Sequence, residues 1–225
     1  MQVSPWARTV AQFPYLISTL LLGLEMTIIV TVGGFALAVV LGLAGAVIRT
    51  TRFGVLRAIG TLYVDVFRAV PVLTQLFILY FGLAEIGIRL APVPAAIIGF
   101  GINGGAYLTE VFRAGIEAVH KGQTEAALSI GMTRMQALRI IILPQAMRVI
   151  LPPLGNFAIG LLKDTSVASS VAAPELTFRA RMLVDQTYLS TQIYLMVAIL
   201  YLAMSLPLAH LVRRLERRGA RERPA

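Results

Sequence analysis

Two opposite charges stand side by side near the middle of the otherwise apolar stretch 151–173. Lys163 and Asp164 are followed directly by the hydroxyl side chains of Thr165 and Ser166. A charge at the centre of a bilayer costs about 2.5 kcal/mol or more, and such charges often mark a path for a polar solute. We therefore predict a polar cavity at this point, in which Lys163 would attract a carboxylate and Asp164 an ammonium group.

The same two charges have a second interpretation that the sequence leaves open. Adjacent residues of a helix point about 100° apart, so Lys163 and Asp164 do not face each other and at least one needs another partner. That partner could be a residue of a neighbouring helix, in an ion pair that only fixes packing. Asn103 is a further candidate for the polar path, although a single buried amide more often hydrogen-bonds across helices. Glu110 has the i,i+3 spacing to pair with Arg113.

Motifs for catalysis or cofactor binding are absent from the sequence. The chain has no cysteine and only two histidines, His120 and His210, which are far apart. It contains no HExxH, no GxSxG and no GxxxxGK[ST] motif. We therefore expect no enzyme activity, no metal and no cofactor. If ATP drives this protein, a separate subunit must carry the nucleotide site.

The composition is that of an integral membrane protein. Of the 225 residues, 57% are hydrophobic and 14% are charged, and the mean hydropathy is +0.79. A net charge of +9 could suggest nucleic acid, but the basic residues alternate with apolar runs, as cytoplasmic loops do under the positive-inside rule. Nucleic acid is therefore not an expected partner. The three basic clusters are Arg49, Arg52 and Arg57; Arg113, Lys121, Arg134, Arg139 and Arg148; and Arg213, Arg214, Arg217, Arg218, Arg221 and Arg223.

We predict an all-α membrane protein with one domain, residues 1–225, and five spanning helices. The fourth span must cross despite its two charges, because otherwise the three basic clusters could not share one side of the membrane. This count puts the N-terminus outside and the C-terminus in the cytoplasm. Pro152 and Pro153 are expected in the first turn of the fourth span. The predicted spans are 20–48, 69–88, 90–112, 151–173 and 191–212.

Small residues recur every four positions on the first predicted span, and a GxxxG pattern lies on the third. Such stripes let helices approach closely, either inside one chain or at a seam between two copies. We expect packing inside the chain, since small-residue stripes are general in membrane proteins. The residues are Gly34, Ala38, Gly42 and Ala46 on the first span and Gly101 and Gly105 on the third.

A compact polar segment, residues 121–145, lies between the third and fourth predicted spans. Residues 125–130 are rich in helix formers, and Gly131 can end that helix in a left-handed conformation. Thr133 and Gln136 have the spacing of a capping box for a second helix, which Pro144 would stop or kink. We predict a cytoplasmic helix-turn-helix that another protein binds.

The sequence of this segment, EAALSIGMTRMQALRIIILP at 125–144, resembles the coupling loop of ABC importer permeases. Residues 67–83, 106–115 and 143–177 extend the resemblance, in order, to about two thirds of the chain. They resemble the polar amino acid branch of these binding-protein-dependent permeases. By this resemblance, the residues that couple the chain to an ATPase are Glu125, Ala126, Ala127, Gly131, Leu143 and Pro144.

The resemblance implies the permease subunit of an ATP-driven importer of polar amino acids in the bacterial inner membrane. Its expected partners are a pair of ABC ATPase subunits, a second permease subunit, identical or a sister chain, an extracytoplasmic amino-acid-binding protein, and membrane lipid. The alternative is an ATP-independent secondary transporter or channel for small polar solutes. Those proteins more often have larger bundles with repeated halves. A membrane anchor is a third possibility, for which the charges at 163 and 164 would be dispensable.

Overall fold

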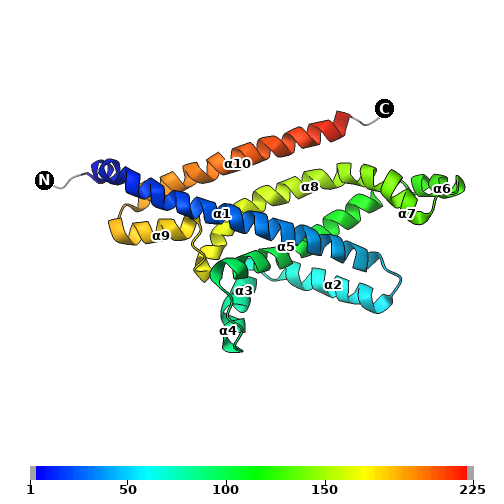
Figure 1. The fold of residues 1–225 in the computed structure, drawn as a ribbon, viewed down its shortest axis with the longest axis horizontal. Coiled ribbons are helices and arrows are strands. Elements are labelled where there is room, and N and C mark those ends of the chain that lie inside the picture. The colour runs from blue at the N-terminus through cyan, green and yellow to red at the C-terminus, as the bar shows by residue number, and fades with distance from the viewer. Residues whose placement is uncertain (1–3, 222–225) are drawn as a thin grey trace.

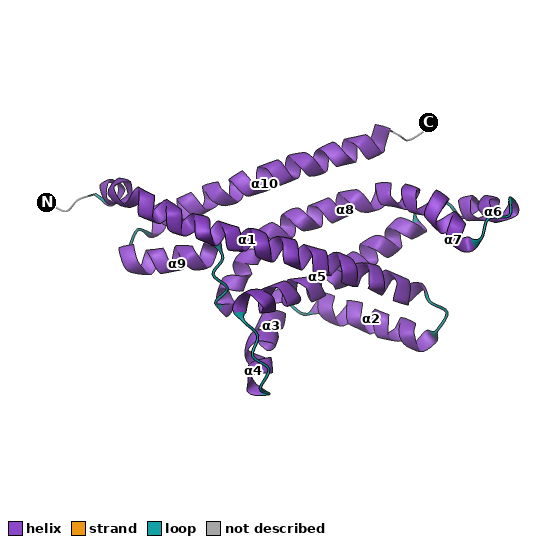
Figure 2. Ribbon diagram, in the orientation of Figure 1, coloured by secondary structure: helices purple, strands orange, loops and turns teal. Residues whose placement is uncertain are grey.

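The protein is described by a computed structural model that covers residues 4–221, with side chains as far as Glu216; Arg223 of the basic tail lies outside the described residues. Every element in this part of the chain is a helix, joined by short loops (Figure 2), which confirms the all-α prediction. The long helices are α1 (Pro5–Thr50), α2 (Gly54–Ala69), α5 (Pro92–Glu117), α8 (Leu143–Asp164) and α10 (Ser190–Arg221). The shorter helices are α3 (Val72–Phe77), η1 (Ile78–Gly82), α4 (Leu83–Glu85), α6 (Lys121–Ser129), α7 (Arg134–Ala137), η2 (Leu138–Ile142), η3 (Thr165–Val171) and α9 (Leu176–Thr187).

The long helices form an elongated bundle. Figure 1 shows α1, α5 and α10 running from the end that holds the N-terminus toward the end that holds the C-terminus, while α8 runs the other way. Helices α6 and α7 protrude at the far end, close to the end of α5 and the start of α8. The loop between α1 and α2 and the C-terminal end of α10 lie at this same end (Figure 1), so the segments that carry the three basic clusters, as far as residue 221, gather there.

Helix α1 is longer than the first predicted span. Ser4 caps its first turn, because the Ser4 hydroxyl accepts a hydrogen bond from the Ala7 amide at 3.2 Å. Pro5 suits the first helical position, where an amide hydrogen would have no partner within the helix and proline has none. The helix has 46 residues, about 69 Å at 1.5 Å per residue, and it begins well before residue 20. That length exceeds the thickness of a bilayer with its headgroups, about 45 Å, so α1 is longer than one crossing needs, and Pro14 lies within its first part.

The second predicted span, 69–88, is not one straight helix. Helix α2 ends at Ala69, and the helical segment Val72–Glu85 that follows is bent from it by 104°. Pro71 is the residue before the second segment, and its ring prevents the first helix from continuing. Within the described residues, four helices are long and apolar enough to cross a membrane, and the bent pair is a fifth crossing if it forms one span. Such a span would begin at residue 54, in a segment that the sequence assigned to a loop.

Two side-chain amides close the bend between α2 and α3. The Nε2 of Gln75 donates to the carbonyls of Phe67 at 2.9 Å and Val70 at 2.8 Å, and the Nδ2 of Asn103 donates to the Phe67 carbonyl at 2.8 Å. The last carbonyls of a helix have no partner within it, and in lipid they have no water either. These amides therefore make the bend possible inside the bundle.

The small-residue stripe of α1 packs against α5 within one chain, as predicted. A Cβ placed on Gly42 would lie 2.7 Å from the Cβ of Leu108, and one placed on Gly34 would lie 3.1 Å from the Cβ of Phe100. From the other side, Gly101 faces Leu37 of α1. The two backbones approach as closely as these glycines permit, which is how small residues join helices in membranes.

Helix α8 continues from the protruding end of the bundle without a stop. The π-helical turn η2 precedes Pro144, which lies in the first turn of α8, so this proline accompanies a widened turn rather than the end of a helix. Pro152 and Pro153 lie inside α8, and not in its first turn as predicted. Proline is tolerated within membrane helices because neighbouring groups satisfy the freed backbone.

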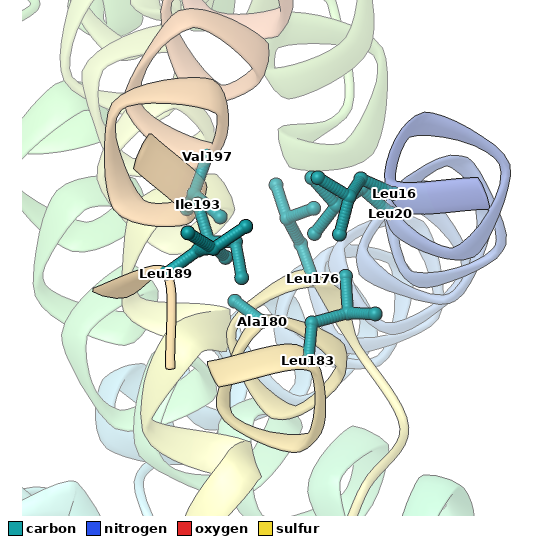
Figure 3. Close-up of a cluster of buried hydrophobic side chains, with 8 residues drawn as sticks. All are labelled: Leu16, Leu20, Leu176, Ala180, Leu183, Leu189, Ile193 and Val197. Atoms are coloured by element: carbon teal, nitrogen blue, oxygen red, sulfur yellow. The ribbon is translucent and has the colours of Figure 1, made fainter. Parts of the chain in front are cut away.

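Helix α9 is held against α1 and α10 by an apolar cluster (Figure 3). Leu176 and Leu183 of α9 point toward Leu16 and Leu20 of α1, and Ile193 approaches from α10 (Figure 3). All five side chains are almost completely buried. The cluster packs the first part of α1 against α9 and α10, the last two helices of the chain.

Candidate solute path and coupling segment

Helix α8 has one packed side and one open side. On the packed side, Leu161 lies in the core with α1 and α5, and a Cβ on Gly155 would lie 2.5 Å from Val212 of α10. About 100° of rotation per residue places another set of residues on the opposite side. We call this set the open face of α8; it consists of Val149, Asn156, Gly160, Lys163 and Asp164.

The predicted charges lie at the end of this open face. Lys163 and Asp164 are the last residues of α8, and both side chains are exposed on the surface of the single chain. Among the residues whose side chains are described, 4–216, neither has a hydrogen bond or a salt bridge with another helix, and the two charges attract each other only as neighbours in the chain. An ion pair that fixes the packing of two helices is therefore absent from this part of the chain, and both charges can interact with a group outside it.

The other predicted path residues are placed differently. Thr165 is completely buried, and its hydroxyl donates to the carbonyl of Leu162 at 2.7 Å, at the junction of α8 and η3. Ser166 is half-buried. Asn103 is committed to the Phe67 carbonyl at the bend described above. The structure thus brings together Lys163 and Asp164, and it gives Asn103 and Thr165 contacts that hold the fold.

Asn156 and Gly160 also belong to the open face, and sequence reasoning missed both. Asn156 is exposed, and nothing lies within 4 Å of a Cβ placed on Gly160. Asn156 stands seven residues before Lys163, a spacing of about two helical turns. That spacing was the signal in the sequence that could have found it.

A network of charges joins α1 to α5 near the protruding end of the bundle. Glu110 forms salt bridges with Arg49 of α1 and with Arg113, whose Nη2 lies 2.7 Å from its Oε2. Arg113 also reaches Glu117 at 2.6 Å. The predicted pairing of Glu110 with Arg113 is confirmed, and the partner from α1, 61 positions earlier in the chain than Glu110, has no local signature in the sequence.

The segment of residues 121–145 folds into two helices around a glycine turn. Gly131 has a φ of +84°, its amide donates to the Leu128 carbonyl at 3.0 Å, and the amide of Met132 donates to the Ala127 carbonyl at 3.1 Å. These two bonds form a Schellman motif, which needs a left-handed residue and so favours glycine. Thr133 and Gln136 form the predicted capping box at the start of α7.

The predicted coupling residues differ in exposure. Glu125 and Ala126 are exposed on α6, whereas Ala127 is 1% exposed and belongs to the interior of the small hairpin. Leu143 and Pro144 are exposed at the start of α8. Between these two places the surface is rich in exposed apolar side chains, which usually indicates a surface that a protein partner covers. They are Leu128, Ile130, Met135, Ile140 and Leu143.

Glu175 is a buried polar residue that the sequence did not single out. Its carboxylate caps α9 by accepting hydrogen bonds from the Phe178 amide at 2.8 Å and the Thr177 amide at 2.9 Å, and the Tyr201 hydroxyl donates to it at 3.2 Å. Burial raises the pKa of Glu175 from 4.5 to about 7, against the lowering effect of these hydrogen bonds. The side chain is completely buried, so it serves the position of α9 and not a path.

Comparisons with known proteins agree over nearly the whole chain. Residues 38–221 match the family of binding-protein-dependent transport system inner membrane components. The chain is 40% identical over 196 residues to the probable glutamine ABC transporter permease protein GlnM of Bacillus subtilis (strain 168), covering 87% of this chain and 91% of that protein. It is 36% identical over 215 residues to the glutamine transport system permease protein GlnP of Escherichia coli (strain K12), covering 95% and 96%.

Solved structures with this fold are also known. The crystal structure of an amino acid ABC transporter with histidines has a chain that superposes with a TM-score of 0.86 at 35% identity, covering 97% of this chain and 100% of that one. An inward-facing structure of the MetNI methionine ABC transporter superposes with a TM-score of 0.65 at 19% identity, covering 92% and 98%. At that identity the second match shows the fold alone.

Proposed function

Because the chain belongs to the family of binding-protein-dependent transport system inner membrane components, we propose that it carries a polar amino acid across the membrane in an ATP-driven importer. It is the permease subunit, a multi-pass protein of the inner membrane. A separate subunit hydrolyses the ATP, and a binding protein outside the membrane delivers the amino acid. Which amino acid is carried depends on that delivery.

The observation that supports this function best is the position of Lys163 and Asp164. Two neighbouring charges, neither of which has a salt bridge to another helix among the described residues, end a membrane-spanning helix on the surface of the single chain. Exposure to lipid would cost several kcal/mol, about 2.5 kcal/mol or more for each charge. A second permease subunit facing the open face of α8 would cover these charges and enclose a hydrated space. A zwitterionic amino acid has the complementary pair, a carboxylate for Lys163 and an ammonium group for Asp164.

The hairpin α6–α7 is the proposed contact with the ATPase subunit. It protrudes from the end of the bundle (Figure 1), and it presents Glu125 and Ala126 beside exposed apolar side chains such as Ile130. The Schellman motif and the capping box fix its two helices at a defined angle. A rigid hairpin of this kind can pass the movement of an ATPase pair to α5 and α8 as a lever.

The proposed orientation has the N-terminus outside and the C-terminus and hairpin in the cytoplasm. The three basic clusters support it, since the described segments that carry them lie at the hairpin end of the bundle and basic residues prefer the cytoplasmic side (Figure 1). Helix α9 then lies on the outer side, where the binding protein would dock.

The test is uptake of L-glutamine by the permease reconstituted in liposomes with its ATPase and binding protein. We expect uptake that requires ATP and the ATPase subunit. The variants Lys163→Met and Asp164→Asn should each lower it at least tenfold while the complex still assembles. Uptake that continues without the ATPase would instead support a secondary transporter or channel, and normal uptake by both variants would contradict the role of the charges.

A further inference from the structure

The open face of α8 carries an inference that rests on the proposed function and goes further. Asn156 is exposed on it, and Gly160 lies one turn nearer to the charges at positions 163 and 164. We infer that Asn156 and Gly160 line the hydrated path of the amino acid and that Gly160, by having no side chain, sets the width of this path beside the two charges. The two residues would therefore select cargo by size and by polarity.

Gly160 differs from the tightly packed glycines of the long helices, such as Gly42 and Gly155, in what surrounds it. A Cβ on Gly155, five positions earlier in α8, would lie 2.5 Å from Val212 of α10, so that glycine permits close packing of two helices. A Cβ on Gly160 would meet no atom of the chain within 4 Å. Glycine in a helix costs about 1 kcal/mol relative to alanine. At Gly155, close packing against α10 gives a reason for the presence of glycine despite this cost. At Gly160, packing within the chain gives no such reason, because the space beside it is open.

The spacing of the open face suits a small zwitterion. Positions 156, 160 and 163 fall within an arc of about 60° on the helix. Asn156 lies about 6 Å along the axis from Gly160, and Lys163 lies about 4.5 Å beyond Gly160 in the other direction. An amino acid whose charged groups face Lys163 and Asp164 would thus pass its α-carbon and side chain over Gly160. Its side chain would reach the amide of Asn156, which can both donate and accept hydrogen bonds.

The backbone adds polarity to the same face. The carbonyl of Val149 would normally accept from the amide of the residue three or four positions later, and these are Pro152 and Pro153, which have no amide hydrogen. Val149 lies on the open face and is 41% exposed. A carbonyl without these donors is costly against lipid and favourable against water. The exposed Asn156 amide therefore favours a hydrated space over contact with hydrocarbon, and water in that space would also be a donor to the Val149 carbonyl.

Accessibility to a charged thiol reagent tests the hydrated path, because the chain has no cysteine of its own. The variants are Gly160→Cys and Asn156→Cys in the assembled complex, and the matched control is Ala158→Cys, on the side of α8 that lines an apolar groove with α10. We expect the first two thiols to react with a cationic thiosulfonate at least tenfold faster than the control. Saturation with binding protein and L-glutamine in the presence of ATP should change their rates and leave the control rate unchanged.

Measurements of L-glutamine uptake test whether Gly160 sets the width of the path. Gly160→Leu should lower L-glutamine uptake at least tenfold, Gly160→Ala should lower it less, and both should retain the ATPase subunit on purification. Asn156→Leu should raise the concentration of L-glutamine needed for half-maximal uptake more than Asn156→Gln does. These effects follow from occupying a narrow path, because a Cβ at position 160 has no neighbour within 4 Å in the described part of the chain.

Several outcomes would overturn the inference. One is a Gly160→Cys thiol that reacts no faster than the Ala158→Cys thiol. Another is full uptake by Gly160→Leu, and a third is loss of complex assembly in Gly160→Leu, which would make position 160 a contact between subunits. Failure of the proposed function looks different, since the unsubstituted complex would then show no ATP-dependent uptake of any amino acid.

Discussion

At the scale of single residues, buried polar side chains close the ends of helices in this protein. Glu175 caps α9, and Gln75 and Asn103 serve the carbonyls at the end of α2. Inside a membrane protein these helix ends have few water molecules to bond, so each such residue decides whether a break in a helix is tolerated. Glu175 differs from Gln75 and Asn103 because its contribution to the stability of the fold depends on pH.

We predict that the stability of the docked α9 falls as the pH rises through about 7. The pKa of Glu175 is raised from 4.5 to about 7 by burial, so the folded state favours the protonated form. Stability from this group is therefore fully present below about pH 4.5 and is lost as the pH rises through the folded pKa, by a free energy on the order of 3 kcal/mol. The measurement is the unfolding temperature of the purified protein in detergent between pH 5 and 8.

Glu175→Gln provides the control for this pH dependence. A glutamine can accept one of the two capping bonds but not both, so the variant should be less stable at low pH by about 1 kcal/mol. Its unfolding temperature should nevertheless change less between pH 5 and 8 than that of the unsubstituted protein. Equal pH dependence of the two proteins would assign the effect to other groups.

Residue types alone indicated part of the candidate site. Lys163 and Asp164 were found because charges in an apolar run are rare, and both are exposed in the structure, with no salt bridge to another helix among the described residues. Asn103 and Thr165 have the same polar character, but their roles depend on which carbonyl lies nearby, and the nearest one to Asn103 belongs to a residue 36 positions earlier. Gly160 has no side chain to attract attention, and only the space around it distinguishes it from Gly155.

At the scale of elements, periodicity predicted the helices better than it predicted their breaks. The stripe of small residues on α1 predicted close packing inside the chain, because four-residue spacing fixes one face of a helix, and the structure shows that the neighbour is α5. The bend of 104° between α2 and α3 was not foreseen. Pro71 gives a local reason for it, but a membrane helix can also accept proline without a large bend, as α8 does at Pro152 and Pro153.

The seam between α1 and α5 gives the second prediction. We expect Gly42→Leu to destabilise the protein by about 1–3 kcal/mol, the usual cost of overpacking, because a Cβ at this position would lie 2.7 Å from the Cβ of Leu108. The measurement is the yield of monodisperse protein and its unfolding temperature in detergent.

Gly54→Ala is the matched control, because nothing lies within 4 Å of a Cβ at the start of α2. Alanine is the better helix former, so this variant should be at least as stable as the unsubstituted protein. Equal behaviour of the Gly42→Leu and Gly54→Ala variants would mean that the seam is looser than the structure describes.

The hairpin α6–α7 gives the third prediction. Gly131→Ala should weaken copurification of the ATPase subunit and lower ATP-driven uptake, because a φ of +84° costs an alanine about 1–2 kcal/mol and the turn would relax. Gly82→Ala is the control, since its Cβ would make only an ordinary contact, 3.8 Å from Ile78. A Gly131→Ala complex that copurifies and transports as well as the Gly82→Ala complex would contradict a rigid hairpin.

At the scale of the whole molecule, the number of crossings determines on which side each segment lies. Helices α1 and α5 run in the same direction (Figure 1), so the chain must return between them, and the elements that lie there in sequence are α2, α3, η1 and α4. Composition alone could not establish this return, because the bent pair contains no single apolar helix of sufficient length. The positive-inside rule gave the same count from the basic clusters.

The fourth prediction follows from this count. With five crossings, Ser4 and Tyr188 lie outside and Ile130 lies in the cytoplasm; with four, the bent pair would not cross and Ser4 would share a side with Ile130. The chain has no cysteine, so Ser4→Cys, Tyr188→Cys and Ile130→Cys each introduce one thiol. Tyr188 and Ile130 are 84% and 75% exposed, so neither site is hidden by the chain itself.

We expect a membrane-impermeant maleimide to label Ser4→Cys and Tyr188→Cys in intact spheroplasts, and to label Ile130→Cys only after lysis. Labelling of Ser4→Cys and Ile130→Cys from the same side would mean that α2 and α3 turn back within the membrane, and the hairpin could then not meet a cytoplasmic ATPase while the N-terminus stays outside.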